Sequence, residues 1–251
     1  MKVMIHAVLF FSLIIFVIDG LTKDPLTFQD STSVEFTIEK TIKHTQIKSQ
    51  DSTGTCWAFA TLSFLESELM RMNREEIDLS EMFVVRHLYP EKAMNYFRLH
   101  SRSTFGEGGL SHDVLASIKK YGMVPESIYP GNKNEEGIYT HSEMISILKA
   151  MLDAVISENN EYRTSLWKNA LQAVLDVYLG QLPEEFVYKS KLYTPQTFSQ
   201  QYLDLDFSDY LELTSFSHHP YYQKFRLEVP DNWSYCDDYF NLTLDELEAV
   251  V

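Results

Sequence analysis

The order of apolar and polar positions divides the chain into an apolar start, a polar lead-in and a mainly helical body. Positions 7–18 are apolar apart from Ser12, and apolar residues alternate with polar ones over 34–39, which favours a strand or an extended lead-in. A turn-rich loop follows at 50–55. Apolar side chains then recur at steps of four, three, four and three, which predicts a helix over 56–72. The stripe consists of Ala58, Leu62, Leu65, Leu69 and Met72.

Later segments carry the spacing or the end signals of further elements. Ser111 is expected to cap a helix that Gly122 ends, and Gly180 is expected to stop a longer one. Thr194 and Pro195 open a short helix. The predicted helices cover 80–85, 112–121, 142–155, 166–178, 194–202 and a final stretch from 243, whereas 210–216 is a predicted strand and 217–241 is predicted to be irregular.

The apolar start has the pattern of a targeting signal. Lys2 gives a short basic end, and the apolar run ends at Asp19 and Gly20. This run is shorter than the roughly 20 residues that a membrane-spanning helix needs. We therefore expect a signal peptide over 1–20, removed near Gly20 or Leu21, and a mature protein that is secreted or periplasmic. An uncleaved N-terminal membrane anchor is the alternative.

Composition narrows the classes of function. The 251 residues contain 36 acidic and 21 basic side chains, and the formal net charge of -15 disfavours binding to nucleic acid as the main activity. With 45% hydrophobic residues the chain can bury one good core. Two cysteines cannot form a dense disulfide framework, and no Cys/His cluster has zinc spacing. Neither a metal site nor a cofactor is therefore expected.

The segment from Gln50 to Phe59 contains the candidate chemistry. Cys56 stands at the first position of the predicted helix, where free backbone N–H groups and the helix dipole favour a nucleophilic thiolate. Across a turn that Gly54 permits, the Gln50 amide can form an oxyanion hole together with the backbone N–H of Cys56. Trp57 would seat the start of the helix in the core. A lone cysteine on a helix is usually inert core, but the combined spacing favours an active site.

This segment resembles the active-site loop of papain-like cysteine peptidases, whose usual run is Gln-Gly-x-Cys-Gly-Ser-Cys-Trp. The residues in register with it are Gln50, Gly54, Cys56 and Trp57. The resemblance implies that Cys56 and Gln50 are catalytic. It also implies that Gly108 and Gly109, with Trp57 beside them, bind the backbone of a peptide substrate as an extended strand. Further similar runs follow in the family's order at 79–81, 105–110, 120–126 and 129–130.

Two departures indicate one branch of that family. The cysteines that usually precede the nucleophile and the glycine pair are absent, and a long helical insertion occupies about 145–230. Both features resemble the bleomycin hydrolase / aminopeptidase C branch. The resemblance implies an α+β, papain-like fold: mainly its helical left domain plus a helical insertion, with the right-hand β-barrel half largely absent. The domains expected are a signal peptide at 1–20, a left domain at 21–144, the insertion at 145–235 and a truncated return to the catalytic domain at 236–251.

The catalytic base is not recognisable in this sequence. The family mechanism needs a His that moves the thiol proton and an Asn or Asp that orients it, and no Asn-Ser-Trp run occurs. We expect each histidine after the nucleophile to be a satisfied or solvated side chain, and Cys236 to be a buried or partly buried thiol. These histidines are His87, His100, His112, His141, His218 and His219.

The resemblance implies a cysteine-type peptidase, and specifically an aminopeptidase, that cleaves peptides through a thioester at Cys56. The family also implies assembly of identical subunits, commonly as hexamers. The alternative is a truncated, catalytically inactive relative, or a peptide-binding module that keeps the glycine loop without turnover.

Overall fold

The computed structural model describes residues 37–157 and 164–250. The chain divides into two compact units, Met1–Thr41 and Ile42–Val251. Of the first unit, residues 37–41 are described, and they form neither helix nor strand. The predicted signal peptide lies outside the described residues, as do residues 34–36 of the predicted strand or extended lead-in; residues 37–39 are described and are not a strand. No helix in the described part is long and apolar enough to cross a membrane.

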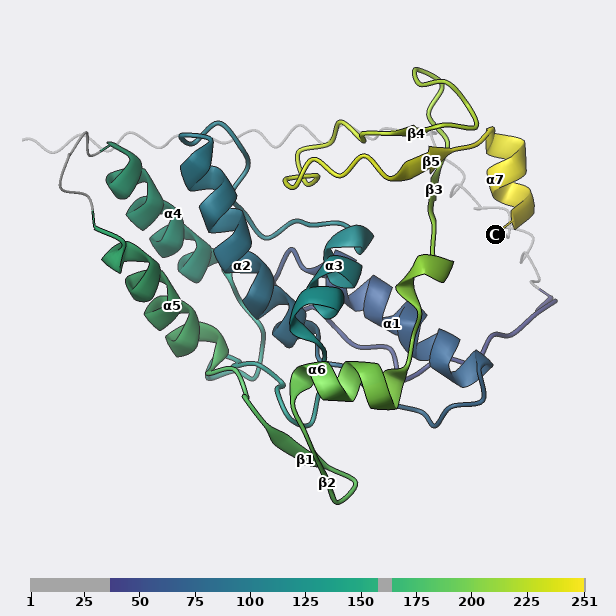
Figure 1. The fold of residues 1–251 in the computed structure, drawn as a ribbon, viewed down its shortest axis with the longest axis horizontal. Helices are drawn as coiled ribbons and strands as arrows, with labels where there is room; N and C mark the ends of the chain where they lie inside the picture. The colour runs from purple at the N-terminus through teal and green to yellow at the C-terminus, as the bar shows by residue number, and fades with distance from the viewer. Residues whose placement is uncertain (1–36, 158–163, 251) are drawn as a thin grey trace, which may run out of the picture. The chain divides into compact units, whose positions relative to one another are not determined.

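The first half of the second unit is a layer of three packed helices (Figure 1). The predicted stripe of the first helix is confirmed at Ala58, Leu62, Leu65 and Leu69, which are buried in the core. Its last member, Met72, lies one residue past the end of the helix and is 42% exposed. Ser80 caps the second helix by accepting a hydrogen bond from the Phe83 N–H at 2.9 Å. The three helices are α1 (Cys56–Arg71), α2 (Glu81–Arg98) and α3 (Ser111–Tyr121).

Two predicted helix boundaries in this layer were wrong. The second helix runs past Val85 and through Pro90, because buried residues such as Tyr89 and Ala93 continue its packed faces. Ser111 is the first residue of α3 rather than its cap, since the residue before it, Leu110, donates its N–H to the Asp113 carboxylate at 2.9 Å. The predicted stop at Gly122 is confirmed, where a positive φ of 79° suits glycine.

Two further helices lie together on one side of α2, as Figure 1 shows, and both were predicted. They are α4 (Ser142–Ser157) and α5 (Leu166–Leu179), which pack against each other through buried leucines. Arg86 of α2 is buried and pairs with Asp176 of α5 at 2.6 Å, so α5 is bonded to the helical layer.

An unpredicted β-hairpin follows α5. Its antiparallel strands are β1 (Phe186–Tyr188) and β2 (Lys191–Tyr193). The hairpin packs on the short helix α6 (Pro195–Phe198), which Thr194 caps as predicted and which continues into the π-helical turn η1 (Ser199–Leu203). Aromatic rings bind the two together; for example, Tyr193 and Phe198 lie edge to face at 5.5 Å.

The last part of the chain is a small three-stranded sheet. Its spatial order is β3 (Glu212–Thr214), β5 (Tyr239–Asn241) and β4 (Lys224–Phe225), with β3 parallel and β4 antiparallel to β5. The strand predicted at 210–216 contains β3, whereas 217–241 is not wholly irregular, because it supplies β4 and β5. The predicted final helix is α7 (Leu244–Val250).

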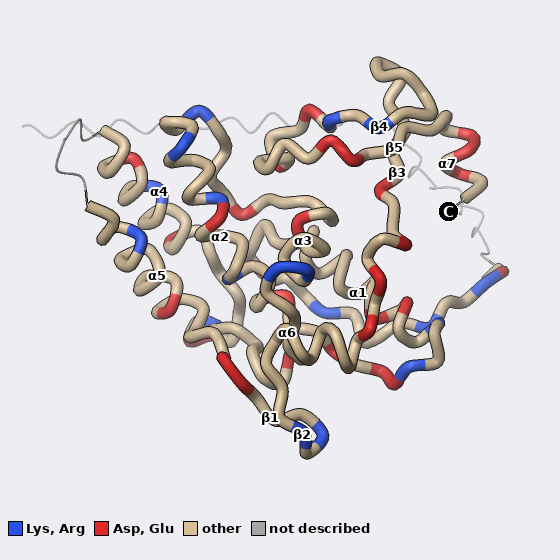
Figure 2. Tube along the Cα trace, in the orientation of Figure 1, with Lys and Arg blue, Asp and Glu red and all other residues tan. Residues whose placement is uncertain are grey.

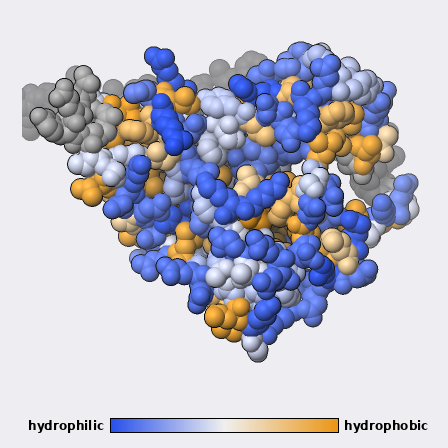
Figure 3. All heavy atoms as spheres, in the orientation of Figure 1, coloured by the Kyte–Doolittle hydropathy of each residue, from blue (hydrophilic) through white to orange (hydrophobic). Residues whose placement is uncertain are grey.

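The surface of this last part combines acidic and apolar side chains. Figure 2 shows acidic positions recurring between α6 and β3 and on α7. Figure 3 shows apolar atoms at the surface beside α7, where Leu244 is 67% exposed and Val250 is 61% exposed. Across the whole fold, the described residues are mostly helical, with two small sheets and no closed barrel.

Candidate active site

Cys56 is the first residue of α1, and its side chain is exposed and unpaired. It stands between two buried neighbours, Thr55 and Trp57, which fix the start of the helix in the protein. The Thr55 carbonyl accepts the N–H groups of Ala58 and Phe59, at 2.9 and 3.3 Å. The backbone N–H of Cys56 lies before the first intrahelical bond, so it remains a donor at the positive end of the helix dipole. The sulfur is accessible to a substrate carbonyl.

Gln50 folds back over the loop that leads to Cys56. Its amide Nε2 donates to the Thr53 carbonyl at 2.5 Å, and the Thr53 hydroxyl donates to the Gln50 carbonyl at 2.8 Å. An amide nitrogen carries two hydrogens, so this geometry leaves one N–H of Gln50 available. The described contacts join Gln50 to the loop but not to Cys56 itself. Its role in an oxyanion hole therefore stays a prediction.

The other side of this loop is held by a second segment of chain. The Ser52 N–H donates to the Tyr139 carbonyl at 3.1 Å, and the Tyr139 N–H donates to the Asp51 carboxylate at 3.1 Å. Ser52 and Thr140 also form an isolated parallel bridge. These bonds hold the loop that precedes α1 to the segment around Tyr139. The position of Cys56 at the start of α1 is therefore fixed before a substrate binds.

The glycine loop, residues 105–110, lies against the start of α1. Glu107 joins the two: its carboxylate accepts the Gly54 N–H at 2.6 Å, and its carbonyl accepts the indole N–H of Trp57 at 3.0 Å. Gly109 packs on the Trp57 ring so closely that an added Cβ would lie 2.8 Å from the ring. The structure thus brings together the predicted residues Trp57, Gly108 and Gly109.

Lys92 of α2 holds the glycine loop from inside, and the sequence analysis missed it. The side chain is buried, and its ammonium donates to the carbonyl of Gly106 at 2.5 Å and to that of Gly108. Burial lowers the pKa of Lys92 to about 8, although nearby carboxylates oppose this shift. Lys92 lies four residues after the buried Leu88 and four residues before the buried Tyr96. This helical spacing was the signal in the sequence that could have identified Lys92 as a buried residue.

A segment from the last part of the chain packs on the far side of the glycine loop. Trp233 is buried and donates its indole N–H to Asp113 at 3.1 Å, while its carbonyl accepts the Asn95 amide at 2.7 Å. Asp231, two residues earlier, lies against Gly108. The site is therefore built from three parts of the sequence: the nucleophile loop, the glycine loop and the segment around Trp233.

None of the described histidines makes a hydrogen bond to Cys56. Burial lowers the pKa of both His87 and His141 to about 4, so each is neutral. His141 lies behind the loop, 3.0 Å from the Tyr89 hydroxyl. His218 and His219 both contact Glu228. The contacts of His218 and His219 agree with the expectation of satisfied or solvated histidines, whereas the Nε2 of His141 is buried and has no hydrogen-bond partner within the described residues.

His112 is the histidine with the most unusual environment. Burial lowers the pKa of His112, but hydrogen bonds to Asp113 and Glu212 outweigh it and raise the pKa to about 9. Its ring nitrogens lie 2.7 Å from the Tyr239 hydroxyl and 2.9 Å from the Ser234 hydroxyl. These contacts connect α3 with the last part of the chain and direct the imidazole into that junction.

The fold also assembles a cluster that the sequence analysis did not foresee. His112, Glu212 and Cys236 each offer a ligand atom, and these atoms lie within 4.8 Å of one another. Both nitrogens of His112 are already hydrogen-bonded, and burial raises the pKa of the Cys236 thiol. The cluster is therefore satisfied without a metal. Cys236 is a partly buried free thiol, as expected.

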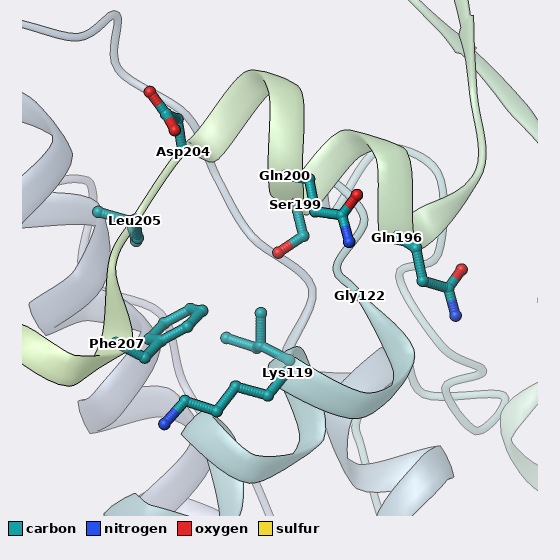
Figure 4. Close-up of a pocket in the computed structure, with 9 residues that line it drawn as sticks. Lys119, Gly122, Gln196, Ser199, Gln200, Asp204, Leu205 and Phe207 are labelled. Atoms are coloured by element: carbon teal, nitrogen blue, oxygen red, sulfur yellow. The ribbon is translucent and has the colours of Figure 1, made fainter.

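A separate hollow lies between α3 and the α6–η1 segment (Figure 4). Its volume is about 270 Å³, and the Lys119 side chain runs beside the Phe207 ring at its edge. None of the five predicted site residues lines it. This hollow is not part of the candidate active site.

Comparisons with known proteins agree with this geometry. The family model described as papain family cysteine protease matches residues 32–207. Aminopeptidase G of Lactobacillus delbrueckii subsp. lactis is 21% identical over 74% of this chain and 51% of its own length. Aminopeptidase C of Streptococcus thermophilus is 23% identical over 92% of this chain and 61% of its own length. The chain thus spans about half to three fifths of these relatives.

A shorter match has a higher sequence identity. A viral cathepsin of Bombyx mori nuclear polyhedrosis virus is 36% identical over 98 residues, or 39% of this chain. Among solved structures, PepW from Lactobacillus rhamnosis HN001 superposes with a TM-score of 0.66 at 19% identity, over 87% of this chain and 57% of that one. The papain-like, mainly helical α+β fold predicted from the sequence is confirmed.

Proposed function

Because the chain belongs to the papain family of cysteine proteases, we propose that it is a peptidase whose nucleophile is the thiolate of Cys56. The observation that carries this proposal is the exposed sulfur at the first position of α1, with the glycine loop bonded to the same position through Glu107. The substrates are peptides, bound as an extended strand on Gly108 and Gly109 beside Trp57.

The proposed reaction proceeds through an acyl-enzyme. The Cys56 thiolate attacks the peptide carbonyl carbon, and the carbonyl electrons move onto oxygen, where the Cys56 N–H and the free N–H of Gln50 are the proposed donors. The C–N bond then breaks, the departing nitrogen takes a proton from solvent water, and a thioester remains. Water hydrolyses the thioester, which returns the thiol and a carboxylic acid.

An aminopeptidase is the proposed type of peptidase. Two of the similar proteins are named aminopeptidases, and both align along most of this chain. The segment around Trp233 packs against the glycine loop, beside the residues that are proposed to bind the peptide. Assembly of identical subunits is proposed by the same analogy.

Export through a signal peptide is also proposed. Its support is the basic end at Lys2 followed by the short apolar run over 7–18. The size of the exported chain would show whether the first residues are removed.

A catalytically silent peptide-binding relative is the second candidate. One observation favours it: within the described residues, no histidine contacts Cys56. General acid–base groups contribute about 10²–10⁴-fold to such reactions, so a nucleophile without one turns over slowly.

Hydrolysis of amino-acid amides of 7-amino-4-methylcoumarin tests the proposal. We expect fluorescence release by the wild-type chain, its loss in Cys56→Ser, and its retention in the matched control Cys236→Ser. Hydrolysis that survives Cys56→Ser would contradict the assignment. Absence of turnover together with selective alkylation of Cys56 would favour the second candidate.

A further inference from the structure

A carboxylate lies directly on one of the two glycines that are proposed to bind the peptide. A Cβ added to Gly108 would lie 2.2 Å from Oδ1 and 2.5 Å from Cγ of Asp231, so the Asp231 carboxylate rests on the Gly108 Cα. Asp231 is exposed. Within the described residues, its carboxylate has no hydrogen-bond partner, so it is available to a ligand.

The neighbours of Asp231 hold this carboxylate in place. Asn232 is buried; its amide donates to the carbonyls of Leu227 and Cys236, both at 2.9 Å, and its side-chain oxygen accepts the Cys236 N–H at 2.8 Å. Trp233 is anchored through its bond to Asp113. The residues that follow Asp231 are therefore fixed to the protein, and Asp231 projects from a braced turn rather than from a free loop.

Negative charge exceeds positive charge around the glycine loop. The carboxylates of Glu107, Asp113 and Asp231 all act on the ammonium of Lys92. Lys92 is already occupied by the carbonyls of Gly106 and Gly108. Asp113 also pairs with the His112 imidazolium, 3.3 Å away, so three carboxylates lie around two cations and leave an excess negative charge that a further cation would neutralise.

Because the Asp231 carboxylate rests on the Gly108 Cα, it lies where the main chain of the substrate is proposed to bind, and not in a pocket for a side chain. A peptide that continued past this point would place an uncharged amide against an unpaired carboxylate. A peptide that ended there would place its α-ammonium group, a compact cation with three donors, against the same oxygens, where a charge-assisted hydrogen bond forms.

We propose that Asp231 binds the free α-ammonium group of a peptide whose backbone lies on Gly108, and thereby selects substrates by their amino terminus. This inference rests on the proposed function and adds its specificity residue. It attributes the preference for a free amino terminus to one side chain of this chain.

Alkylation of Cys56 by substrate-like probes tests this inference without requiring turnover. The probes are glycyl-phenylalanyl chloromethyl ketone with a free amino group and the same compound acetylated on nitrogen. The proteins are wild type, Asp231→Asn, and Asp237→Asn as the matched control, because Asp237 is an exposed acid of the same segment. All three carry Cys236→Ser, and each rate is divided by the iodoacetamide rate of the same protein.

We expect the free-amine probe to react about tenfold faster than the acetylated probe with wild type, as one charge-assisted hydrogen bond implies. The ratio should fall to about one in Asp231→Asn and remain at the wild-type value in Asp237→Asn. A ratio that Asp231→Asn leaves unchanged, or no preference in wild type, overturns the inference. A thermal melt of each variant shows whether it is folded.

Three further outcomes are distinguishable. An acetyl-lysyl-phenylalanyl probe carries its ammonium on a side chain; if Asp231 accelerates this probe and not the free-amine probe, the α-ammonium assignment is wrong. If neither iodoacetamide nor any probe labels Cys56, the proposed function fails. If the probes label Cys56 with no dependence on Asp231, only the specificity inference fails.

Discussion

The two regions that meet at the glycine loop are built in different ways. The region from the nucleophile loop to Gly122 is held by apolar packing: Leu62 and Leu65 are fully buried, and Trp57 closes the core beside the nucleophile. The region from 204 to 250 has strands of two or three residues, and Leu211 and Leu213 in or beside β3 are 51% and 36% exposed. It is held mainly by polar contacts.

This difference shows how the site is divided. A nucleophile needs a fixed position, and the packed helical layer provides it, because close-packed interiors resist displacement. The late region contributes Asp231 and Trp233 through hydrogen bonds to α2 and α3. Under the two proposals above, substrate selection lies in the less densely packed region and nucleophilic chemistry in the more densely packed one.

The largest expected effect compares one leucine from each region. Leu62→Ala should lower the free energy of unfolding by about 2–5 kcal/mol, because it leaves a cavity in a fully buried site. Leu213→Ala should cost less than about 1 kcal/mol, because that side chain is 36% exposed. Urea unfolding followed by circular dichroism measures both. Equal losses would remove the contrast between the regions.

The next effect concerns the junction between the regions and depends on pH. The folded-state pKa of His112 is about 9, above its ordinary value of 6.5, so His112 stabilises the fold fully below pH 6.5 and progressively less as pH rises through 9. We expect His112→Gln to cost up to about 3 kcal/mol at pH 6, and less at pH 9.5.

The pH series is measured as the difference between wild type and His112→Gln at each pH. Other groups that titrate in this range, such as Glu81 with a pKa raised to about 8 by burial, cancel in this difference. A difference that stays constant with pH would show that the imidazolium does not hold the junction.

A third prediction concerns the polar anchor of the late region. Asn241 in β5 is fully buried; its amide donates to the carbonyls of Phe216 and His219, and its side-chain oxygen accepts the Phe216 N–H at 2.8 Å. Asn241→Ala should cost about 2 kcal/mol, because it leaves buried carbonyls unpaired. Exposed Asn132→Ala is the control. Equal unfolding midpoints for the two variants would show that polar contacts do not hold this region.

The smallest effect tests the packing of the glycine loop on Trp57. In Gly109→Ala the new methyl group would lie 2.8 Å from the Trp57 ring, so the loop must shift. In Gly106→Ala nothing lies within 4 Å of the new methyl group. We expect Gly109→Ala to slow alkylation of Cys56 by the dipeptidyl probe about tenfold, or about 1.4 kcal/mol, and Gly106→Ala to have little effect. The opposite order would place the peptide elsewhere.

The packed region was the more predictable of the two. The spacing of Ala58, Leu62 and Leu65 fixes one helical face, so the sequence alone locates α1 and places Cys56 at its first position. The proximity of the glycine loop to that position also followed from the family resemblance. The Glu107 contacts that join them, at sequence separations of 50 and more, carry no local signal.

The late region was less predictable for a physical reason. Strands as short as β4 and β5 show little alternation, and their pairing depends on the buried Asn241 rather than on an apolar face. The packing of Asp231 on Gly108 is a contact across more than a hundred residues, which one sequence does not encode in its periodicity. The role of Lys92 was missed because lysine is ordinarily read as a surface residue.

The central claim is that Cys56, at the start of α1, is the reactive thiol of this protein. Its most direct test is the rate of alkylation of each cysteine by iodoacetamide at pH 6.5, measured in one sample by peptide mapping. Burial raises the pKa of the Cys236 thiol and lowers its reactivity, whereas Cys56 is exposed at a helix N-terminus. We predict that Cys56 is alkylated at least about tenfold faster than Cys236. A rate for Cys56 equal to or below that of Cys236 would contradict the account.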